Sequence, residues 1–427
     1  MNILWFTNSA CGSIRRFSES VKSGGWMISL EDEIKKCSNI NLSVAYISTT
    51  KENSFKYDGV TYYPIWKKNP RNKIKRVLSR FTSYEKQDSM LLPQLLKVVD
   101  IAKPDLIHIH GTEECYGLIQ DVIKDIPIVF SIQGLIAPYK EKYFSGMTFV
   151  DVKKYEKYIE KIRQVSVVNN YKSFCYRSER EKHYLANANY VLGRTFWDRD
   201  CTLALNPKRK YFMVNEILSD CFYHKRWNKS SFGDTIKLVS TISGGIYKGF
   251  ETVLKTADLL SKYTNLKFEW HIAGYTEQTK WVKIAEKITK LNSSDYPIKF
   301  HGRIDAEDLS NLLISSDIYI HVSHIENSPN SVCEAMLLGM PIIASFAGGT
   351  ASLLENGKEG LLYQDGDSFV LAGLVLEIIN DFEYARQMGI YACNHATERH
   401  DKLKILNELL FAYKKIISVS SQKMAIN

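Results

Sequence analysis

The chain has 427 residues, of which 45% are hydrophobic and 24% charged, and its formal net charge is +9. This length is too great for one ordinary core, so two domains are the default expectation, and the composition excludes a disordered or fibrous protein. No apolar run approaches the ~20 residues that a membrane-spanning helix needs, and the positive charge favours acidic partners such as nucleic acid, anionic lipid or phosphorylated substrates.

The amino terminus, MNILWFTNSACG, has neither a basic start nor a long apolar core, which predicts a first β-strand and not a signal peptide. The eight cysteines stand singly, without a C-x-x-C pair. In a chain of this length they indicate reduced core thiols, so we expect a cytoplasmic protein.

Short β-rich runs alternate with helical patterns along the whole chain. The first half contains strand candidates at residues 2–8, 40–48, 105–111, 126–134 and 189–195. The second half contains strand candidates at residues 236–243, 268–274, 298–304, 318–323 and 341–348. Between them lie helical segments such as Phe250–Tyr263, whose apolar residues form one stripe. Strand–helix alternation predicts parallel sheets covered on both faces, and it occurs twice.

We therefore predict an α/β protein with two doubly wound, Rossmann-like domains that face each other across a cleft. The polar, aromatic stretch 222–234 is the predicted linker. Residues 1–221 then form the first domain and residues 235–400 the second. The last helix, within 401–427, is expected to pack back across the domain junction. Ligands of such sheets bind at the C-terminal ends of the strands.

Two glutamates follow the strand predicted at 318–323. Glu326 lies in the loop after this strand, and Pro329 fits the first turn of the next helix. Glu334 lies about one turn inside that helix among apolar residues, where an unpaired carboxylate is costly. Ligand hydroxyl groups would satisfy it, and the helix N-terminus offers N–H groups to an anion. A polyhydroxylated, phosphorylated ligand meets both demands; a core ion pair of Glu334 beside a solvated Glu326 is the alternative.

Two further loops follow strands of the second half. STISGGIYKGF places Gly244 and Gly245 in a turn and Lys248 at the start of a helix, where a cation is unfavourable unless an anion is present. An ordinary turn with an exposed lysine is the alternative. Gly348 and Gly349 lie in the third loop. Three such loops indicate a nucleotide-diphosphate site, and the lack of a Walker loop and of G-x-G-x-x-G disfavours ATP hydrolysis and NAD binding.

These residues resemble the retaining GT-B glycosyltransferases of family 4. The signature is E-x7-E at Glu326 and Glu334 within S-x-x-E-N-S-P-N-S-V-x-E-A-M-x-x-G-x-P-I-I-A-S, followed by G-G, with the family's K-G pair beginning at Lys248. In the first half, S-G-G-W, with Gly24 and Gly25, stands where the family has its glycine-rich loop. PDLIHIHG and SIQG resemble the family's two strand-end motifs, so the resemblance covers most of the chain.

The resemblance implies a nucleotide-diphosphate-sugar donor and a transfer that retains the anomeric configuration without metal or cofactor. Glu334 is implied to bind the ribose hydroxyls and Glu326 the sugar hydroxyls, with backbone groups of Asn327 and Ser328 near the sugar and diphosphate. Lys248 is implied to neutralise the leaving diphosphate. Front-face attack assisted by the departing phosphate needs no protein nucleophile. The implied acceptor is a saccharide, often lipid-linked, in a surface polysaccharide such as capsule, O-antigen or exopolysaccharide.

Two positions depart from the family pattern. Ser243 stands where the family usually has an arginine, so one cationic contact to the diphosphate is missing, and Arg194 and Arg303 are candidates to supply it. In SIQG, Gln133 replaces a common histidine. Glutamine can donate a hydrogen bond but cannot carry charge or shuttle a proton, which weakens a catalytic role for that position.

The strand at 105–111 places His108 and His110 on one face. His110 lies nearest the strand end, where ligands collect, so it is a predicted catalytic and acceptor-side residue, and His108 is expected to be a hydrogen-bonded core residue. Gln133 and Arg194 are the other acceptor-side candidates.

Residues Trp66–Phe81, WKKNPRNKIKRVLSRF, contain seven basic residues and no acidic one. Their apolar residues fall on one side at helical spacing, which predicts a basic amphipathic helix suited to an anionic membrane surface. A solvated helix packed on its own domain explains the pattern equally well. The family context favours peripheral binding at the inner face of the plasma membrane. No nucleic-acid-binding module accompanies the charge, so no nucleic-acid partner is expected.

The leading hypothesis is a glycosyltransferase that builds a surface polysaccharide. A nucleotide-sugar epimerase on the same fold lacks E-x7-E followed by G-G, and only Ser243 favours a non-catalytic donor-binding protein. A nucleic-acid-binding protein would leave Glu334 unexplained. The sequence leaves the nucleotide, the sugar, the acceptor and the linkage open.

Overall fold

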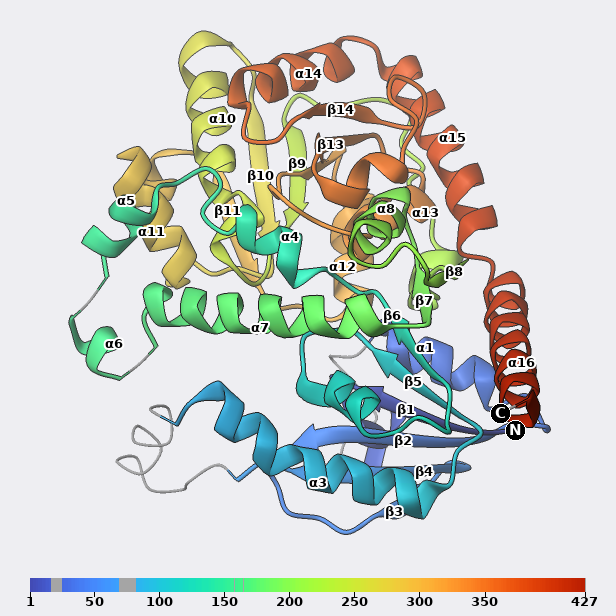
Figure 1. Ribbon diagram of the computed structural model, residues 1–427. Helices are drawn as coiled ribbons and strands as arrows, with labels where there is room; N and C mark the ends of the chain where they lie inside the picture. Colours follow the sequence, from blue (N-terminus) through green and yellow to red (C-terminus); the bar gives the residue numbers. More distant parts are fainter. Residues whose placement is uncertain (17–24, 69–81, 157, 164, 427) are drawn as a thin grey trace.

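A computed structural model describes residues 1–16, 25–68, 82–156, 158–163 and 165–426. Figure 1 shows two α/β domains, each built around its own sheet. The predicted fold class is confirmed, and each of the ten predicted strands is present.

The first sheet has eight strands in the order β3-β4-β2-β1-β5-β6-β7-β8. Neighbouring strands run parallel except β3 and β4, which form an antiparallel pair. The bounds are β1 (Asn2–Thr7), β2 (Asn41–Ser48), β3 (Phe55–Tyr57), β4 (Val60–Trp66), β5 (Leu106–His110), β6 (Ile128–Ser131), β7 (Tyr190–Gly193) and β8 (Lys210–Met213). The strand order reverses between β1 and β5, which is where a crevice opens in a doubly wound sheet.

The second sheet has six parallel strands in the order β11-β10-β9-β12-β13-β14, so its own strands follow the order 3-2-1-4-5-6. The bounds are β9 (Ile236–Thr241), β10 (Phe268–Ala273), β11 (Ile298–Gly302), β12 (Ile318–His321), β13 (Ile342–Phe346) and β14 (Leu361–Gln364). This is the dinucleotide-binding arrangement, and its reversal point lies between β9 and β12.

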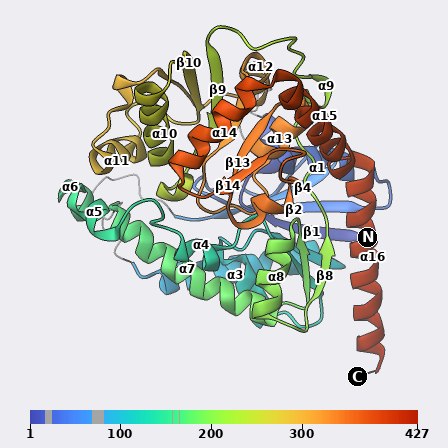
Figure 2. The same cartoon turned by 90° about the horizontal axis from the view of Figure 1, so that it is seen from above.

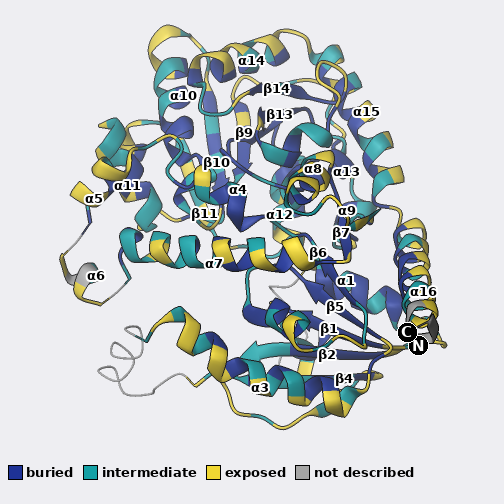
Figure 3. Ribbon diagram, viewed as in Figure 1, coloured by how far each residue is buried: buried dark blue, intermediate teal, exposed yellow. Residues whose placement is uncertain are grey.

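Helices cover the sheets (Figure 2). Their bounds are α1 (Gly25–Ile34), α3 (Tyr84–Ala102), α4 (Ile136–Glu141), α5 (Phe149–Lys154), α6 (Tyr158–Ile162), α7 (Val167–Asn187), α8 (Phe196–Leu205), α9 (Cys221–His224), α10 (Phe250–Tyr263), α11 (Lys280–Thr289), α12 (Ala306–Ser315), α13 (Asn330–Leu338), α14 (Ser368–Asn380), α15 (Phe382–Arg399) and α16 (Lys402–Ile426). Figure 3 shows the burial of the central strands and of the inner helix faces.

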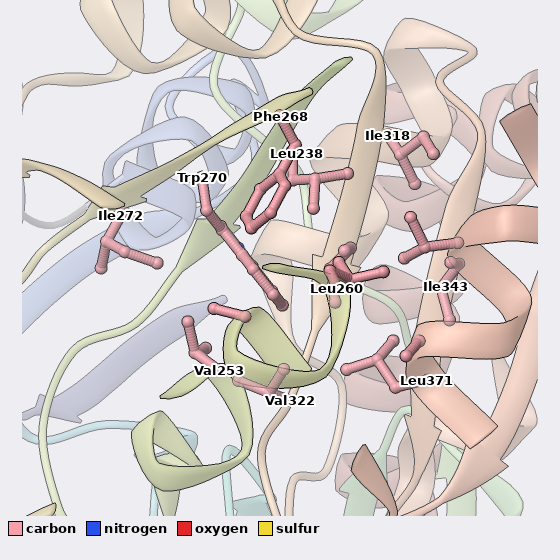
Figure 4. Packing of buried hydrophobic residues seen from close by; sticks show 14 of the residues in the cluster. Leu238, Val253, Leu260, Phe268, Trp270, Ile272, Ile318, Val322, Ile343 and Leu371 are labelled. Carbon is pink, nitrogen blue, oxygen red and sulfur yellow. The ribbon is translucent and has the colours of Figure 1, made fainter. Parts of the chain in front are cut away.

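The core of the second domain forms between β9, β10 and the stripe of α10 (Figure 4). Val253 and Leu260 of this stripe are fully buried, as the periodicity of Phe250–Tyr263 predicts. Trp270 fills the space between sheet and helix, and its indole N–H donates to Ser240 Oγ at 3.0 Å. A buried indole is thereby satisfied inside an otherwise apolar core.

The chain crosses from the first domain to the second near residue 217. Ile217 packs in the core of the first domain, whereas Leu218, Phe222 and Trp227 pack in the core of the second. The stretch 222–234, predicted as a linker, therefore lies on the second domain in the structure, because its aromatic side chains are buried there.

Helix α16 packs on the first domain, beside the amino-terminal strands in Figures 1 and 2. The Tyr413 hydroxyl accepts a hydrogen bond from Trp5 Nε1 at 2.9 Å and lies 2.6 Å from His108 Nδ1. His108 Nε2 bonds Ser131 Oγ at 2.5 Å, which confirms the predicted core role of His108. The last helix thus fastens the end of the chain to its beginning.

A mixed apolar cluster closes one side of the junction between the domains. Ile136, Tyr139 and Phe174 of the first domain pack with Ile246 and Ile325 of the second. Ile246 lies in the segment after β9, and Ile325 lies in the loop after β12. This cluster therefore fixes both segments against the first domain.

Most of the predicted basic helix Trp66–Phe81 falls on residues 69–81, which lie outside the described residues. Trp66 itself ends β4. Among the helices of the described ranges, none has the length and apolarity to cross a membrane.

Substitution Tyr413→Phe should lower the free energy of unfolding by about 1–3 kcal/mol, because Trp5 and His108 each lose a buried partner. The urea midpoint of unfolding measures this loss. Tyr391→Phe, on a 42% exposed ring, is the control. Equal midpoints for the two variants would show that α16 does not depend on this contact.

Candidate functional site

The predicted site residues gather where the reversal points of the two sheets face each other. Two hydrogen bonds link the domains there: Thr195 Oγ1 donates to Asn327 Oδ1 at 2.7 Å, and Asn327 Nδ2 donates to the Gln133 carbonyl at 3.4 Å. Asn327 belongs to the β12–α13 loop (residues 322–329), so this loop contacts strand ends of the first domain directly.

An ion pair stands at the centre of the site. Lys248 Nζ contacts Glu326 Oε1, and His321 Nε2 lies 3.9 Å from the same oxygen. Burial alone would raise the pKa of Glu326, but Lys248 and His321 lower it to about 2, so the carboxylate is ionised at neutral pH. Lys248 and Glu326, predicted from separate motifs, are therefore direct partners.

Close backbone packing brings this pair together. Gly249, directly after η3 (Ile246–Lys248), has φ +77°, and a Cβ there would clash with the Val322 carbonyl oxygen. Only glycine tolerates both conditions. Gly244, at φ +101°, and Gly245 form the turn before η3, where both carbonyls accept from Tyr275 Oη at 3.2 Å. The loop after β9 thus packs closely against Val322, directly after β12, which places Lys248 next to Glu326.

The G-G loop supports the β12–α13 loop from the other side. Gly349 N donates to the Glu326 carbonyl at 2.8 Å, and a Cβ on Gly348 would clash with that same carbonyl oxygen. These glycines, predicted as donor-binding, contact the protein backbone in η5 (Gly348–Ser352), and the Gly349 N–H is already bonded. Their observed role is to position Glu326.

Glu334 is the fifth residue of α13, which starts just after Pro329 and ends at Gly339 with φ +77°. Its neighbours Cys333 and Ala335 are fully buried, yet its carboxylate has no hydrogen bond or salt bridge within the described part of the chain. The alternative of a core ion pair is therefore wrong. Burial, with a contribution from the charge of Glu216, raises the pKa of Glu334 to about 7.

His110 ends β5 but is only 1% exposed, so it lies beneath the cleft surface. Its ring stacks 3.7 Å from His108 and packs against Trp5, and neither ring nitrogen has a partner among the described residues. Burial, His108 and Arg194 together depress its pKa, so the imidazole is neutral. The catalytic role of His110 stays a prediction, limited to a neutral hydrogen-bonding group.

A cavity of about 330 Å³ opens beside the β12–α13 loop. Its lining comes from both domains: Asn8, Ser9, Gly25, Trp26, Met27, Gln133 and Asn330. Two predicted residues, Gly25 and Gln133, thus share one cavity, whereas Gly24 lies outside the described residues. A larger cavity, about 520 Å³, lies at the amino ends of β6 and β7, the sheet edge opposite to the site.

Arg194 lies behind Trp26, which lines the 330 Å³ cavity, and does not itself line that cavity. Its guanidinium carbon lies 4.2 Å from the Trp26 ring centroid, and its Nε lies 3.4 Å from Glu216 Oε2. Arg303, the other candidate for a second cation, is exposed after β11 at the edge of the second sheet.

Two residues of the site are absent from the sequence-based prediction. Thr195, which contacts Asn327, begins α8 with a capping box to Asp198, and T-x-x-D is a signal for such a cap. Glu216, which accepts from Ser328 Oγ at 2.7 Å, stands in V-N-E-I-L, and a lone acid between apolar residues is its sole signal.

Beside the loop, His324 is 2% exposed between two carboxylates. Its Nε2 lies 2.5 Å from Glu251 Oε1, and its Nδ1 lies 3.1 Å from Asp365 Oδ2. Lys142 of the first domain lies 3.7 Å from the same aspartate. Burial lowers the pKa of His324, but Asp365 and Glu251 outweigh it and raise it to about 9.

Among the described residues, one group could bring three ligand atoms to a metal ion: Glu216, Cys333 and His400. Ser328 and Arg194 already occupy the carboxylate of Glu216, and a nearby arginine repels a cation. We assign this group to an ion-pair network and not to a metal site.

Residues 224–395 match the sequence profile of the family "Glycosyl transferases group 1". These residues form a domain of this family, which is family 4 of the GT-B glycosyltransferases. The matched segment contains Lys248, Glu326 and Glu334, so the residues that carry the resemblance in sequence are those brought together in space.

Curated relatives match only part of the chain. An uncharacterised glycosyltransferase of Methanocaldococcus jannaschii is 29% identical over 193 residues, which is 44% of this chain and 46% of that protein. The N-acetyl-alpha-D-glucosaminyl L-malate synthase of Bacillus anthracis is 28% identical over 220 residues, 50% of this chain and 56% of that protein. The chain thus spans about half the length of these relatives.

Solved structures match over nearly the whole length. A sucrose-phosphate synthase of Thermosynechococcus elongatus superposes with a TM-score of 0.70 at 14% identity, covering 98% of this chain and 99% of that one. Anabaena HepE in complex with UDP and glucose gives 0.65 at 18% identity, covering 97% and 99%. At these identities the likeness establishes the GT-B fold alone.

The fold should lose stability as the pH rises from about 6.5 to about 9. An unfolded histidine has a pKa of about 6.5, so the protonated His324 stabilises the fold fully below that pH and ceases to do so once it deprotonates near pH 9. The loss should be on the order of 3 kcal/mol. Thermal unfolding at pH 6 and pH 9.5 measures it.

His324→Gln should flatten this pH dependence, and His183→Gln, on a half-exposed side chain, should not. The same pH dependence in His324→Gln as in the wild type would refute the assignment.

Proposed function

We propose that the protein transfers a sugar from a nucleotide-diphosphate sugar to a saccharide acceptor, with retention of the anomeric configuration and without a metal ion. The observation that carries this proposal is the carboxylate of Glu334, which has no protein partner among the described residues and lies in the first turns of α13, the helix after the loop that carries Glu326. A partly exposed acid without a protein partner is free to accept hydroxyl donors from a ligand, and a paired lysine at a loop supplies charge for a diphosphate.

Donor binding would exchange partners at this pair. The diphosphate oxygens would take Lys248, which frees Glu326 to accept hydroxyl groups of the sugar, while Glu334 accepts the ribose hydroxyls. Lys248 would then neutralise the negative charge that develops as the diphosphate leaves. Backbone groups of Asn327 and Ser328 lie beside Glu326 for contacts to the sugar and diphosphate.

The reaction would proceed on one face of the sugar. The bond from the anomeric carbon to the diphosphate oxygen breaks, the acceptor oxygen bonds to that carbon from the same side, and its proton passes to the departing phosphate. No protein nucleophile is needed. His110, neutral and buried, would contribute at most a hydrogen bond on the acceptor side with Gln133 and Arg194.

The donor class is proposed to be a UDP-sugar, since Anabaena HepE was solved with UDP, glucose and UDP-glucose. The acceptor is proposed to be a growing, lipid-linked surface polysaccharide. The amylovoran biosynthesis glycosyltransferase of Erwinia amylovora, 26% identical over 137 residues, supports this class. Reaction at the cytoplasmic side of a membrane would follow from such an acceptor.

Thermal-shift titration with UDP-, GDP-, ADP- and CMP-sugars tests the donor site. One nucleotide class should stabilise the wild type by about 2.7 kcal/mol at a hundredfold excess over Kd. Glu334→Ala should lose that shift while remaining folded. No shift with any nucleotide sugar would contradict the proposal and favour a protein that has lost donor binding through Ser243.

Donor affinity should depend on the ionisation of Glu334. With a pKa of about 7, the carboxylate is mostly protonated at pH 6 and mostly ionised at pH 8. If the ribose hydroxyls donate to the ionised form, affinity for the best nucleotide sugar should be about tenfold weaker at pH 6 than at pH 8. Calorimetric titration measures this, with Glu334→Gln as the control that should show no such difference. Equal affinity at both pH values would rule out this role.

A further inference from the structure

We infer that Glu216 is a positioning residue of the transfer reaction, whose carboxylate fixes the donor loop and the acceptor side of the cleft in one arrangement. This inference rests on the proposed function. Glu216 is 1% exposed and lies just before the point where the chain crosses between the domains. A buried carboxylate at such a crossing is costly unless both domains supply partners.

On the donor side, Glu216 Oε1 accepts from Ser328 Oγ at 2.7 Å and from Cys333 Sγ at 3.5 Å. Ser328 stands two residues after Glu326, and Cys333 stands one residue before Glu334. The same oxygen therefore holds both the loop that carries one donor glutamate and the first turns of the helix that carries the other.

On the acceptor side, Glu216 Oε2 pairs with Arg194 Nε at 3.4 Å and has no hydrogen bond. The side chain of Arg194 is 6% exposed and stacks on Trp26, which lines the cavity between the domains. Burial would raise the pKa of Glu216, but Arg194, with smaller contributions from His400, Arg399 and Ser328, lowers it to about 2. The ionised carboxylate of Glu216 thus holds the guanidinium of Arg194 against the Trp26 ring.

Arg399 and His400, at the junction between α15 and α16, also contact Glu216 and its partners. His400 Nδ1 lies 2.9 Å from the Glu216 carbonyl, and Arg399 Nη2 donates to the Arg194 carbonyl at 2.8 Å and lies 3.5 Å from Ser328 Oγ. Burial lowers the pKa of His400 to about 4, so the imidazole is neutral. Both domains and the C-terminal segment therefore meet at Glu216.

Glu216 also sets the electrostatic environment of Glu334. Among the described residues, its negative charge is the one charged contribution that raises the pKa of Glu334 beyond the effect of burial. The other titratable groups that interact with Glu334 are Cys221 of α9 and Tyr319 of β12, both neutral at pH 7. Removing the charge of Glu216 must therefore lower the pH at which Glu334 ionises.

Glu216→Gln tests the inference, with Asp317→Asn as the matched control. Asp317 is 1% exposed and pairs with Lys229 at 2.5 Å, but it stands at the amino end of β12, opposite to the site. Glu216→Gln should lower kcat at least tenfold, weaken binding of the best nucleotide sugar, and move the acidic limit of that binding to lower pH. In the folded fraction of Asp317→Asn, kcat, the affinity for the nucleotide sugar and the acidic limit of binding should all equal those of the wild type.

A purely structural role would lower activity only in proportion to the folded protein, with KM and the pH limit unchanged, and that result would overturn the inference. If Glu216→Gln does not fold because Arg194 is left unpaired, the double variant Glu216→Gln/Arg194→Gln removes both charges and should still show the shifted pH limit. An unshifted limit in the double variant would equally refute the role of Glu216.

The two proposals fail in different ways. If the wild type binds no nucleotide sugar, the proposed function is wrong and this inference falls with it. If the wild type binds a nucleotide sugar and Glu216→Gln matches it in kcat, KM and pH limit, only the inference is wrong.

Discussion

The ion pair between Lys248 and Glu326 is the contact on which the site depends. The two residues lie 78 positions apart in the sequence. They meet because Gly249 and Gly348 let the segments after β9 and β13 pack closely against the loop that follows β12. A methyl group at either glycine would separate the charges. These two glycines thus position Glu326 and Lys248 by packing backbone against backbone.

The same loop is fixed from the first domain. Thr195 and the Gln133 carbonyl bond to Asn327, Glu216 bonds to Ser328, and Ile325 packs into the apolar cluster at the junction. Three residues of one loop, Ile325, Asn327 and Ser328, therefore contact the other domain or the crossing segment. A change in this loop therefore alters the contacts between the two domains.

The parts of this protein that repeat a pattern could be predicted, and single contacts could not. Strand–helix alternation predicted ten of the strands β1–β14 and both sheets, but it missed the antiparallel hairpin of β3 and β4 and the short edge strands β8 and β14. The turn between β3 and β4, Asp58-Gly59 with φ values of +48° and +80°, carried a usable hairpin signal. The E-x7-E spacing located Glu326 and Glu334, whereas nothing in V-N-E-I-L shows that Glu216 would meet Ser328 from a separate domain.

A crystal structure with the bound nucleotide sugar tests the central claim most directly. Lys248 Nζ should then lie within hydrogen-bond distance of a diphosphate oxygen and no longer contact Glu326, and Glu334 should accept hydrogen bonds from the ribose hydroxyls. A bound nucleotide sugar that leaves the Lys248–Glu326 pair intact, or a ribose that lies away from Glu334, would contradict it.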